Sequence, residues 1–335
     1  MLYSIPKTKM LSAAQNSLSP FSKPRSMLAE LLFFLIVAMI GGTAITLAQS
    51  VFTTSIMFFD SEYYGVVEQM TQDGSFDSQV LAMYIEAFMA NLPDYAHIFF
   101  VASTALYVPA AIIYCKRFEK RKPFSMGFNK RGVMPEYLMG ILVGAVMIAI
   151  PAAICYVTGC VTFSFGSSSP LMIVLFFVAF VLQGMGEEVF FRGYLLTSLT
   201  RRNHEWVAII ISSVVFSIFH LPNAGFNVIA FVNITLFGVF AAVFMLKRGS
   251  IWAVSAIHTA WNFIQGNILG IRVSGNPKFA SVFNSVNAEF GSVLNGGEFG
   301  LEGGLGVTAV LLLALLFTLM MPAKKSEIDN SQILF

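Results

Sequence analysis

Runs of apolar residues close to the ~20 residues that a helix needs to cross a bilayer recur along the whole chain. Eight of them can be drawn, at residues 27–52, 96–115, 137–157, 171–197, 206–221, 226–246, 251–271 and 304–321. Hydrophobic residues make up 56% of the chain and charged residues only 11%, whereas soluble globular domains carry roughly 25% charged residues. The sequence therefore predicts an all-α fold, a polytopic transmembrane helical bundle of about eight spans, and argues against a water-soluble protein.

The charged residues predict how this bundle is oriented. Between Arg25 and Lys116 there is no Lys or Arg, and the connection at residues 59–94 is acidic. Every second connection is basic, with clusters within residues 116–131, 201–202, 247–248 and 324–325. Because basic connections tend to stay in the cytoplasm, we predict a multi-pass protein of the cell membrane with both termini cytoplasmic.

Net charge and cysteine content argue against two other classes of protein. A net charge of +2 without a basic face gives no indication of nucleic-acid binding. Cys115, Cys155 and Cys160 are odd in number and lie at the ends of apolar runs. We therefore expect them to be packing residues, not a disulfide framework or a CxxC metal site.

The fourth apolar run contains three ionisable residues in the string GMGEEVFFRGYLL, namely Glu187, Glu188 and Arg192. A charge at the centre of a membrane helix costs roughly 2.5–3.5 kcal/mol on insertion scales, so these side chains need partners or water. Glu188 and Arg192 are four residues apart on one helix face and predict an ion pair. Glu187 points about 100° round the helix from Glu188. Since it has no adjacent counter-charge, we predict that it is a functional carboxylate, suited to act as a general base.

Two later runs supply imidazole and amide side chains. FSIFHLPN places Phe216 four residues before His220, and HTAWN places His258 four residues before Asn262. Counted from the neighbouring cytoplasmic turns, Glu187 and His220 lie at about the same depth, roughly 25 Å along the helix axis, and the HTAWN pair lies at roughly 15–20 Å. We therefore predict that these side chains meet in one layer, as a base, an acid and hydrogen-bond donors for an oxyanion.

The strings EExxxR, FxxxH and HxxxN, in this order on a polytopic chain, resemble the CAAX prenyl endopeptidase and bacteriocin-processing (CPBP) family of intramembrane proteases, also called the Abi family. The resemblance covers roughly residues 170–270. The strings SGNPKF and GGEFGLEGG that follow look like bacterial members of the family. The resemblance implies a helical bundle with a conical cavity open to the cytoplasm and the bilayer, and proteolysis near the C-terminus of a membrane-anchored substrate.

The resemblance also implies roles for individual residues. Glu187 would activate water with the assistance of His220, while His258 and Asn262 would bind that water or stabilise the oxyanion. The residues expected to support this set are Glu188, Arg192 and Phe216.

Four regions follow from this reading of the chain. They are a cytoplasmic N-terminal tail at 1–26, two spans with an acidic outer loop and a basic inner loop at 27–135, a CPBP-like protease core at 136–322, and a cytoplasmic C-terminal tail at 323–335.

Three alternatives stay open at this point. No cofactor is predicted for the leading mechanism, but Glu187, His220 and His258 are also a possible ligand set for Zn²⁺, with water in the fourth position. The buried polar cluster also suits an ion site of a transporter, although no inverted repeat is visible. The third alternative is a non-catalytic immunity or scaffold protein. For a protease, the expected partner is a membrane-anchored protein or peptide in the lipid bilayer, prenylated or not.

Overall fold

The computed structural model describes residues 8–16, 26–60, 64–65, 68, 78–130 and 132–322. The rest of both predicted terminal tails, including the basic pair Lys324 and Lys325, and most of the acidic loop predicted at 59–94 lie outside these residues.

Among the described residues, five helical stretches are long and apolar enough to cross a membrane. They are α2 (Met27–Phe58), Asp94–Arg117, α7 (Val133–Val157), Pro170–Leu199 and α11 (Val228–Arg248). The second stretch comprises α5 (Asp94–Ser103), the 3₁₀ turn η1 (Thr104–Leu106) and α6 (Tyr107–Arg117). The fourth comprises α8 (Pro170–Glu188), the π-helical segment η3 (Val189–Leu196) and α9 (Thr197–Leu199). These helices support the predicted membrane location.

Three shorter helices occupy the remaining predicted runs. They are α10 (Glu205–Ile218), α12 (Trp252–Phe263), which continues into the π-helical segment η4 (Ile264–Ile268), and α14 (Leu305–Met320). The number of crossings and the side of the membrane on which the termini lie stay predictions. The other short elements are α1 (Lys9–Gln15), α4 (Ser78–Ala90), η2 (Pro123–Met126), η5 (Glu289–Gly291), α13 (Ser292–Asn295), η6 (Gly297–Phe299) and η7 (Leu301–Gly303).

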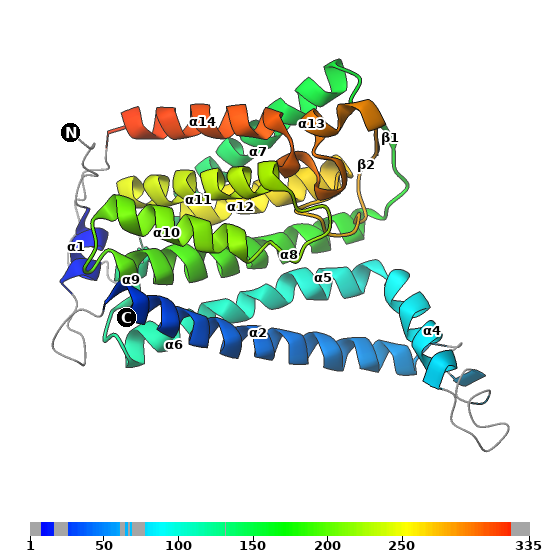
Figure 1. Cartoon of the computed structure of the whole chain (residues 1–335), viewed down its shortest axis with the longest axis horizontal. Coiled ribbons are helices and arrows are strands. Elements are labelled where there is room, and N and C mark those ends of the chain that lie inside the picture. The colour runs from blue at the N-terminus through cyan, green and yellow to red at the C-terminus, as the bar shows by residue number, and fades with distance from the viewer. Residues whose placement is uncertain are drawn as a thin grey trace.

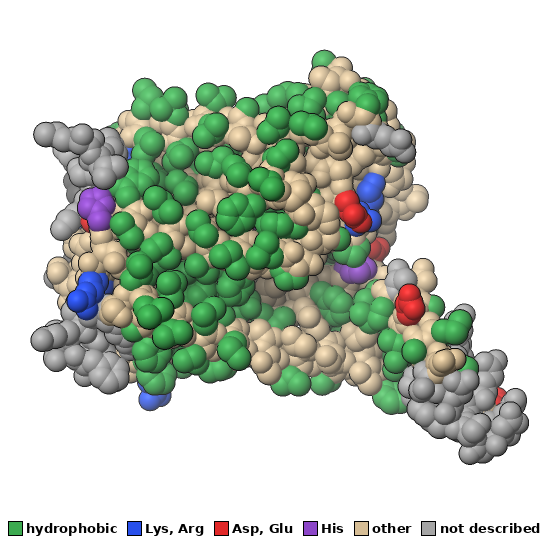
Figure 2. Space-filling model, viewed as in Figure 1, with side chains coloured by type: hydrophobic (Ala, Val, Ile, Leu, Met, Phe, Trp, Pro, Cys, Tyr) green, Lys and Arg blue, Asp and Glu red, His purple; other side chains and the backbone are tan. Residues whose placement is uncertain are grey.

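The main helices run along the long axis of the molecule, and α1 lies at the same end as the last turn of α14 (Figure 1). Hydrophobic side chains cover the middle of the face seen in Figure 2, while the charged side chains visible there lie toward the two ends of that axis. This distribution is the one expected of a bundle whose middle contacts lipid and whose ends contact water.

The predicted all-α class misses a small sheet at the end opposite α1 (Figure 1). Strands β1 (Val161–Phe165) and β2 (Phe283–Asn287) pair antiparallel, with Val161 opposite Asn287. Each strand has only five residues, and the two pair across a long stretch of chain. The sequence pattern therefore does not distinguish either strand from a loop.

Helix α10 ends at Ile218, three residues before the predicted end of its run. His220 N donates to Ser217 O at 3.0 Å and Leu221 N donates to Ile218 O at 3.1 Å, which are turn contacts. The following Pro222 disfavours the helical conformation for the residue before it. His220 therefore lies in a turn just beyond the helix and not on its last turn.

Helix α12, which carries the HTAWN string, packs against α7 and α8 at glycines. A Cβ at Gly140 would lie 2.3 Å from the Ala253 carbonyl oxygen, and one at Gly144 would lie 2.4 Å from that of Ile257. On α8, a Cβ at Gly184 would lie 2.8 Å from a backbone oxygen of α12. Small residues at helix contacts let backbones approach closely in membrane bundles. These three glycines therefore fix where α12 lies.

Replacing Gly144 with Val is expected to lower the free energy of unfolding by about 1–3 kcal/mol or more, because the added carbons overpack the contact with α12. Thermal unfolding of the purified protein in detergent measures the change. The matched control is Gly42→Ala on α2, where an added Cβ meets nothing closer than the Tyr107 hydroxyl at 3.5 Å. A Gly144→Val protein as stable as the wild type would contradict this account of the packing.

Candidate active site

The two adjacent glutamates of the fourth run differ in their surroundings. The Glu188 side chain is fully buried, and its Oε1 lies 3.1 Å from Nη1 of Arg192, which confirms the predicted ion pair. The Glu187 side chain keeps 15% of its surface exposed, and its Oε2 lies 3.8 Å from Nε2 of His258. Glu188 is thus held inside the protein, while part of the Glu187 side chain stays accessible.

The backbone changes from α-helical to π-helical directly after Glu188, at Val189. A π-helix has wider turns than an α-helix, and such segments occur frequently at functional sites. Just before this change, a Cβ at Gly186 would lie 2.6 Å from the Thr104 carbonyl oxygen of η1. The 3₁₀ turn that interrupts the α5 to α6 stretch therefore packs directly on the backbone beside Glu187.

His258 on α12 links the two carboxylates. Its Nδ1 lies 2.9 Å from Oε1 of Glu188, within hydrogen-bonding distance. Its Nε2 faces Oε2 of Glu187 at 3.8 Å, which is too long for a direct hydrogen bond. Because a carboxylate accepts, Nδ1 donates to Glu188, and this bond orients the ring so that Nε2 faces Glu187.

His220 is fixed by its own backbone. Its Nδ1 lies 2.9 Å from the carbonyl oxygen of Phe216. Since a carbonyl only accepts, Nδ1 carries the hydrogen, and in the neutral ring Nε2 is left as an acceptor. The Phe216 ring lies next to both imidazoles, with centroid distances of 4.8 Å to His220 and 6.2 Å to His258. The Arg192 guanidinium lies 4.1 Å from the same ring centroid, so Phe216 separates the ion pair from His220.

Asn262 lies one turn after His258 on α12. Its Nδ2 donates to Oε1 of Gln183 at 2.9 Å. Gln183 lies one turn before Glu187 on α8. This bond ties α12 to α8 at the level of the catalytic candidates.

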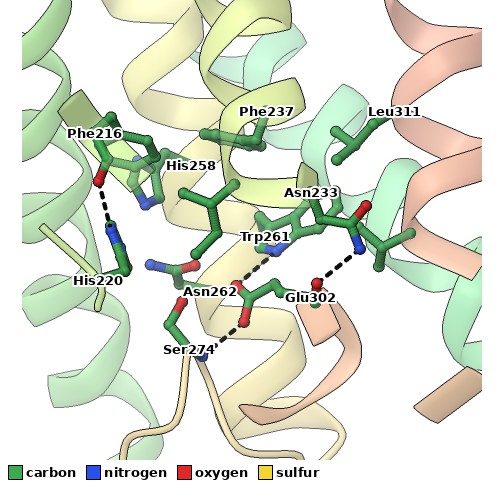
Figure 3. A pocket seen from close by; sticks show the side chains of 12 residues that line it. Phe216, His220, Asn233, Phe237, His258, Trp261, Asn262, Ser274, Glu302 and Leu311 are labelled. Atoms are coloured by element: carbon green, nitrogen blue, oxygen red, sulfur yellow. Dashed lines mark hydrogen bonds between the residues drawn. The ribbon is translucent and has the colours of Figure 1, made fainter. Parts of the chain in front are cut away.

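A cavity of about 30 Å³ joins several of these residues. Space of roughly 10–15 Å³ is enough for one water molecule, so the cavity has room for about two. Its lining residues are Phe216, His220, Asn233, Ile234, Phe237, His258, Trp261, Asn262, Ser274, Glu302, Val307 and Leu311. Figure 3 shows His220, His258 and Asn262 around this space. Glu187 is not part of the lining but lies beside His258.

Residues 169–264 match the family model of the Rce1-like type II CAAX prenyl endopeptidases. The Rce1-like segment is 96 of the 335 residues and contains all of EExxxR, FxxxH and HxxxN. A comparison with curated proteins finds no match. The match confirms the resemblance drawn from the sequence and, at the level of the family, supports an intramembrane endopeptidase.

Three side chains at this site were not predicted from the sequence. Gln183 lies inside the Rce1-like segment, four residues before Glu187, and as a polar residue in an apolar run it offered a signal. Tyr107 and Glu302 lie outside that segment. Tyr107 stacks on Phe190 with centroids 4.4 Å apart and interacts electrostatically with Glu187. Nothing in the sequence pairs Tyr107 with α8.

The arrangement bears directly on the zinc alternative. Among the described residues, no three His, Cys, Asp or Glu side chains form a group able to hold a metal ion. Glu187, His220 and His258 of the Rce1-like segment therefore do not form a three-ligand site in this arrangement.

Proposed function

We propose that the protein is an intramembrane endopeptidase that hydrolyses a peptide bond near the end of a membrane-anchored protein or peptide, using water activated by Glu187 and His220. The observation that carries this proposal is the position of His258. Its ring bonds the buried Glu188, faces the partly exposed Glu187, and borders the same small cavity as His220 and Asn262.

Each residue of the site acts in a particular step of this reaction. Glu187 takes a proton from a water molecule while the water oxygen bonds to the scissile carbonyl carbon, and the carbonyl becomes an oxyanion. Asn262 Nδ2 and Nε2 of His258, in its imidazolium form, donate hydrogen bonds to that oxyanion. The C–N bond then breaks, and the proton passes to the leaving nitrogen with the help of His220. Glu188 and Arg192 hold His258 in place.

Replacing His220 with Ala is expected to lower kcat/KM for substrate cleavage roughly 10²–10⁴-fold, because a positioned acid–base group is lost. The measurement compares peptides of membranes that contain the wild-type or the His220→Ala protein. The control is His204→Ala, since the His204 side chain is 53% exposed, at the start of α10. Unchanged cleavage by a correctly folded His220→Ala protein would contradict the role of His220, whereas absence of cleavage by the wild type would favour a non-catalytic scaffold or a transporter.

Activity of the purified protein is expected to survive incubation with a zinc chelator, because the water is activated by a carboxylate. The rate of cleavage is measured before and after chelation, and the metal content of the active protein is measured beside it. Loss of activity to the chelator, restored by added Zn²⁺, would make the metallo-type alternative the correct mechanism.

A further inference from the structure

A buried carboxylate outside the Rce1-like segment has no step in the proposed reaction. Glu302 lies in η7, between β2 and α14, and only 7% of the residue is exposed. It borders the same cavity as His220 and His258, but both of its carboxylate oxygens already accept hydrogen bonds from the protein. Any effect of Glu302 on the reaction therefore acts through the groups that it holds.

The donors to Glu302 come from two separate parts of the chain. Oε1 accepts from Trp261 Nε1 at 3.2 Å and Oε2 accepts from Gln265 Nε2 at 3.1 Å, and these two donors are four residues apart on the helix that carries His258. Oε2 also accepts from the main-chain N of Ser274 at 2.6 Å, in the loop after η4. Figure 3 shows the carboxylate between Trp261 and Ser274. Glu302 thus joins α12 to this loop.

Ser274 has a backbone conformation that needs support. Its φ of +47° lies in the left-handed region, which costs a residue other than glycine of the order of 1–3 kcal/mol and persists where neighbouring contacts fix it. The peptide groups on both sides of Ser274 are held. Its N donates to Glu302, and its carbonyl oxygen accepts from Nδ2 of Asn223 at 2.8 Å. The bond to Glu302 therefore helps to direct the Ser274 carbonyl toward Asn223.

Asn223 carries this restraint to His220. Its main-chain N donates to the His220 carbonyl oxygen at 3.0 Å, which closes the turn that follows α10. Its side chain ties the same turn to Ser274, 51 residues further along the chain. One nitrogen of the His220 ring, Nδ1, is held by the carbonyl oxygen of Phe216. The position of the turn therefore decides where the other nitrogen, Nε2, points.

We propose that Glu302 is a positioning residue for the cleavage reaction, which places His220 through Ser274 and Asn223 and steadies α12 through Trp261. Loss of the carboxylate leaves its three N–H donors without their acceptor and frees the turn that carries His220. A misplacement of about 1 Å at a distance from the chemistry lowers a rate roughly 10²-fold. This inference rests on the proposed function.

Cleavage of a palmitoylated synthetic peptide tests the link between the turn and Ser274. N-terminally palmitoylated 12-residue peptides of varied sequence are given to the full-length protein in lipid nanodiscs, and mass spectrometry selects the one that the wild type cleaves fastest. Asn223→Ala removes the donor to Ser274 at a half-buried position. It is expected to lower kcat about 10–100-fold, because His220 is no longer held in place, and to leave KM unchanged.

The matched control is Asn276→Ala. Asn276 is exposed in the same loop as Ser274, and its Nδ2 donates to the carbonyl oxygen of Val273 at 2.9 Å. This replacement removes the same kind of bond without touching the path to His220. Its kcat is expected to equal that of the wild type.

Combining two replacements shows whether Glu302 acts by the same path. Glu302→Met keeps an unbranched side chain but accepts no N–H bond of comparable strength, and it is expected to lower kcat at least as much as Asn223→Ala. Adding Asn223→Ala to Glu302→Met is expected to lower kcat no further, because residues of one network do not give additive losses. Losses that multiply, or an Asn223→Ala protein with the kcat of the wild type, would overturn the inference.

Hydrogen exchange tests the same path without turnover. The main-chain N–H groups of His220 and Asn223 donate within the turn. Both are expected to exchange faster in Asn223→Ala and in Glu302→Met than in the wild type, while exchange across α7 stays unchanged. Wild-type exchange of the turn in Asn223→Ala rejects the inference even where Glu302→Met fails to fold. Absence of cleavage that depends on Glu187 would instead reject the proposed function, so the two failures are distinguishable.

Discussion

Peptide-bond cleavage is expected to fall by at least 10²–10⁴-fold when Glu187 is replaced by Gln, a loss typical of removing a positioned general base. The amide has nearly the same size as the carboxylate but cannot take a proton from water. Among the described residues, the ion-pair contact of the Glu187 carboxylate is with His258 at 3.8 Å, so its replacement leaves the buried Glu188 network intact. The measurement is the rate of product formation by purified wild-type and variant protein in nanodiscs.

The control for this variant is Glu298→Gln. It removes a carboxylate whose side chain is 63% exposed and whose Oε1 lies 3.9 Å from Nη1 of Arg272. Its rate is expected to equal that of the wild type. Comparing peptides of membranes that contain active or Glu187→Gln protein also identifies the substrate, because a missing product names both the protein and the bond. Wild-type turnover by Glu187→Gln would refute the assignment of Glu187.

The second large effect concerns stability. Replacing Glu188 with Gln is expected to lower the free energy of unfolding by about 3–5 kcal/mol, because it removes the nearest counter-charge of the buried Arg192 guanidinium. Arg192 is only 1% exposed, and Glu188 lies 3.1 Å from it. His258 also loses the carboxylate that orients its ring. Thermal unfolding in detergent gives the size of the change.

A double replacement tests whether the buried charge of Arg192, rather than the changed shape of residue 188, causes the loss of stability. Glu188→Gln combined with Arg192→Met removes both charges, so it is expected to recover much of the lost stability. It is expected to stay inactive, because His258 is no longer held by a carboxylate. Arg272→Gln, at the exposed pair with Glu298, is expected to change stability by less than about 1 kcal/mol. A double variant no more stable than Glu188→Gln alone would show that the buried charge is not the cause.

The sequence predicted those parts of the site that depend on spacing within one helix. The pair Glu188 and Arg192 is four residues apart, and the helical repeat alone brings such residues together. Counting depth along the helices predicted that Glu187, His220, His258 and Asn262 share one layer. The last three line one cavity, whereas Glu187 lies outside its lining, beside His258. The assignment of catalytic roles to these residues stays a prediction.

Other parts were not predictable because they depend on contacts between distant segments. The bond from Asn262 to Gln183 needs the crossing of α12 and α8, which the glycine contact at Gly184 sets. The placement of Glu302 beside Trp261 depends on the path of a long connection. The π-helical segment after Glu188 is short and has no periodic signal, since its hydrogen bonds span five residues where those of an α-helix span four.

The early end of α10 has a consequence for water inside the bundle. Its 14 residues measure about 21 Å at 1.5 Å per residue, well short of the ~30 Å hydrocarbon core of a bilayer. If α10 crosses the membrane, the irregular segment from Phe219 to Asn227 completes the crossing, and backbone outside a regular helix is tolerated at that depth only beside protein or water. The need for protein or water next to His220 is then a property of the main chain, set by Pro222, whichever side chains surround it.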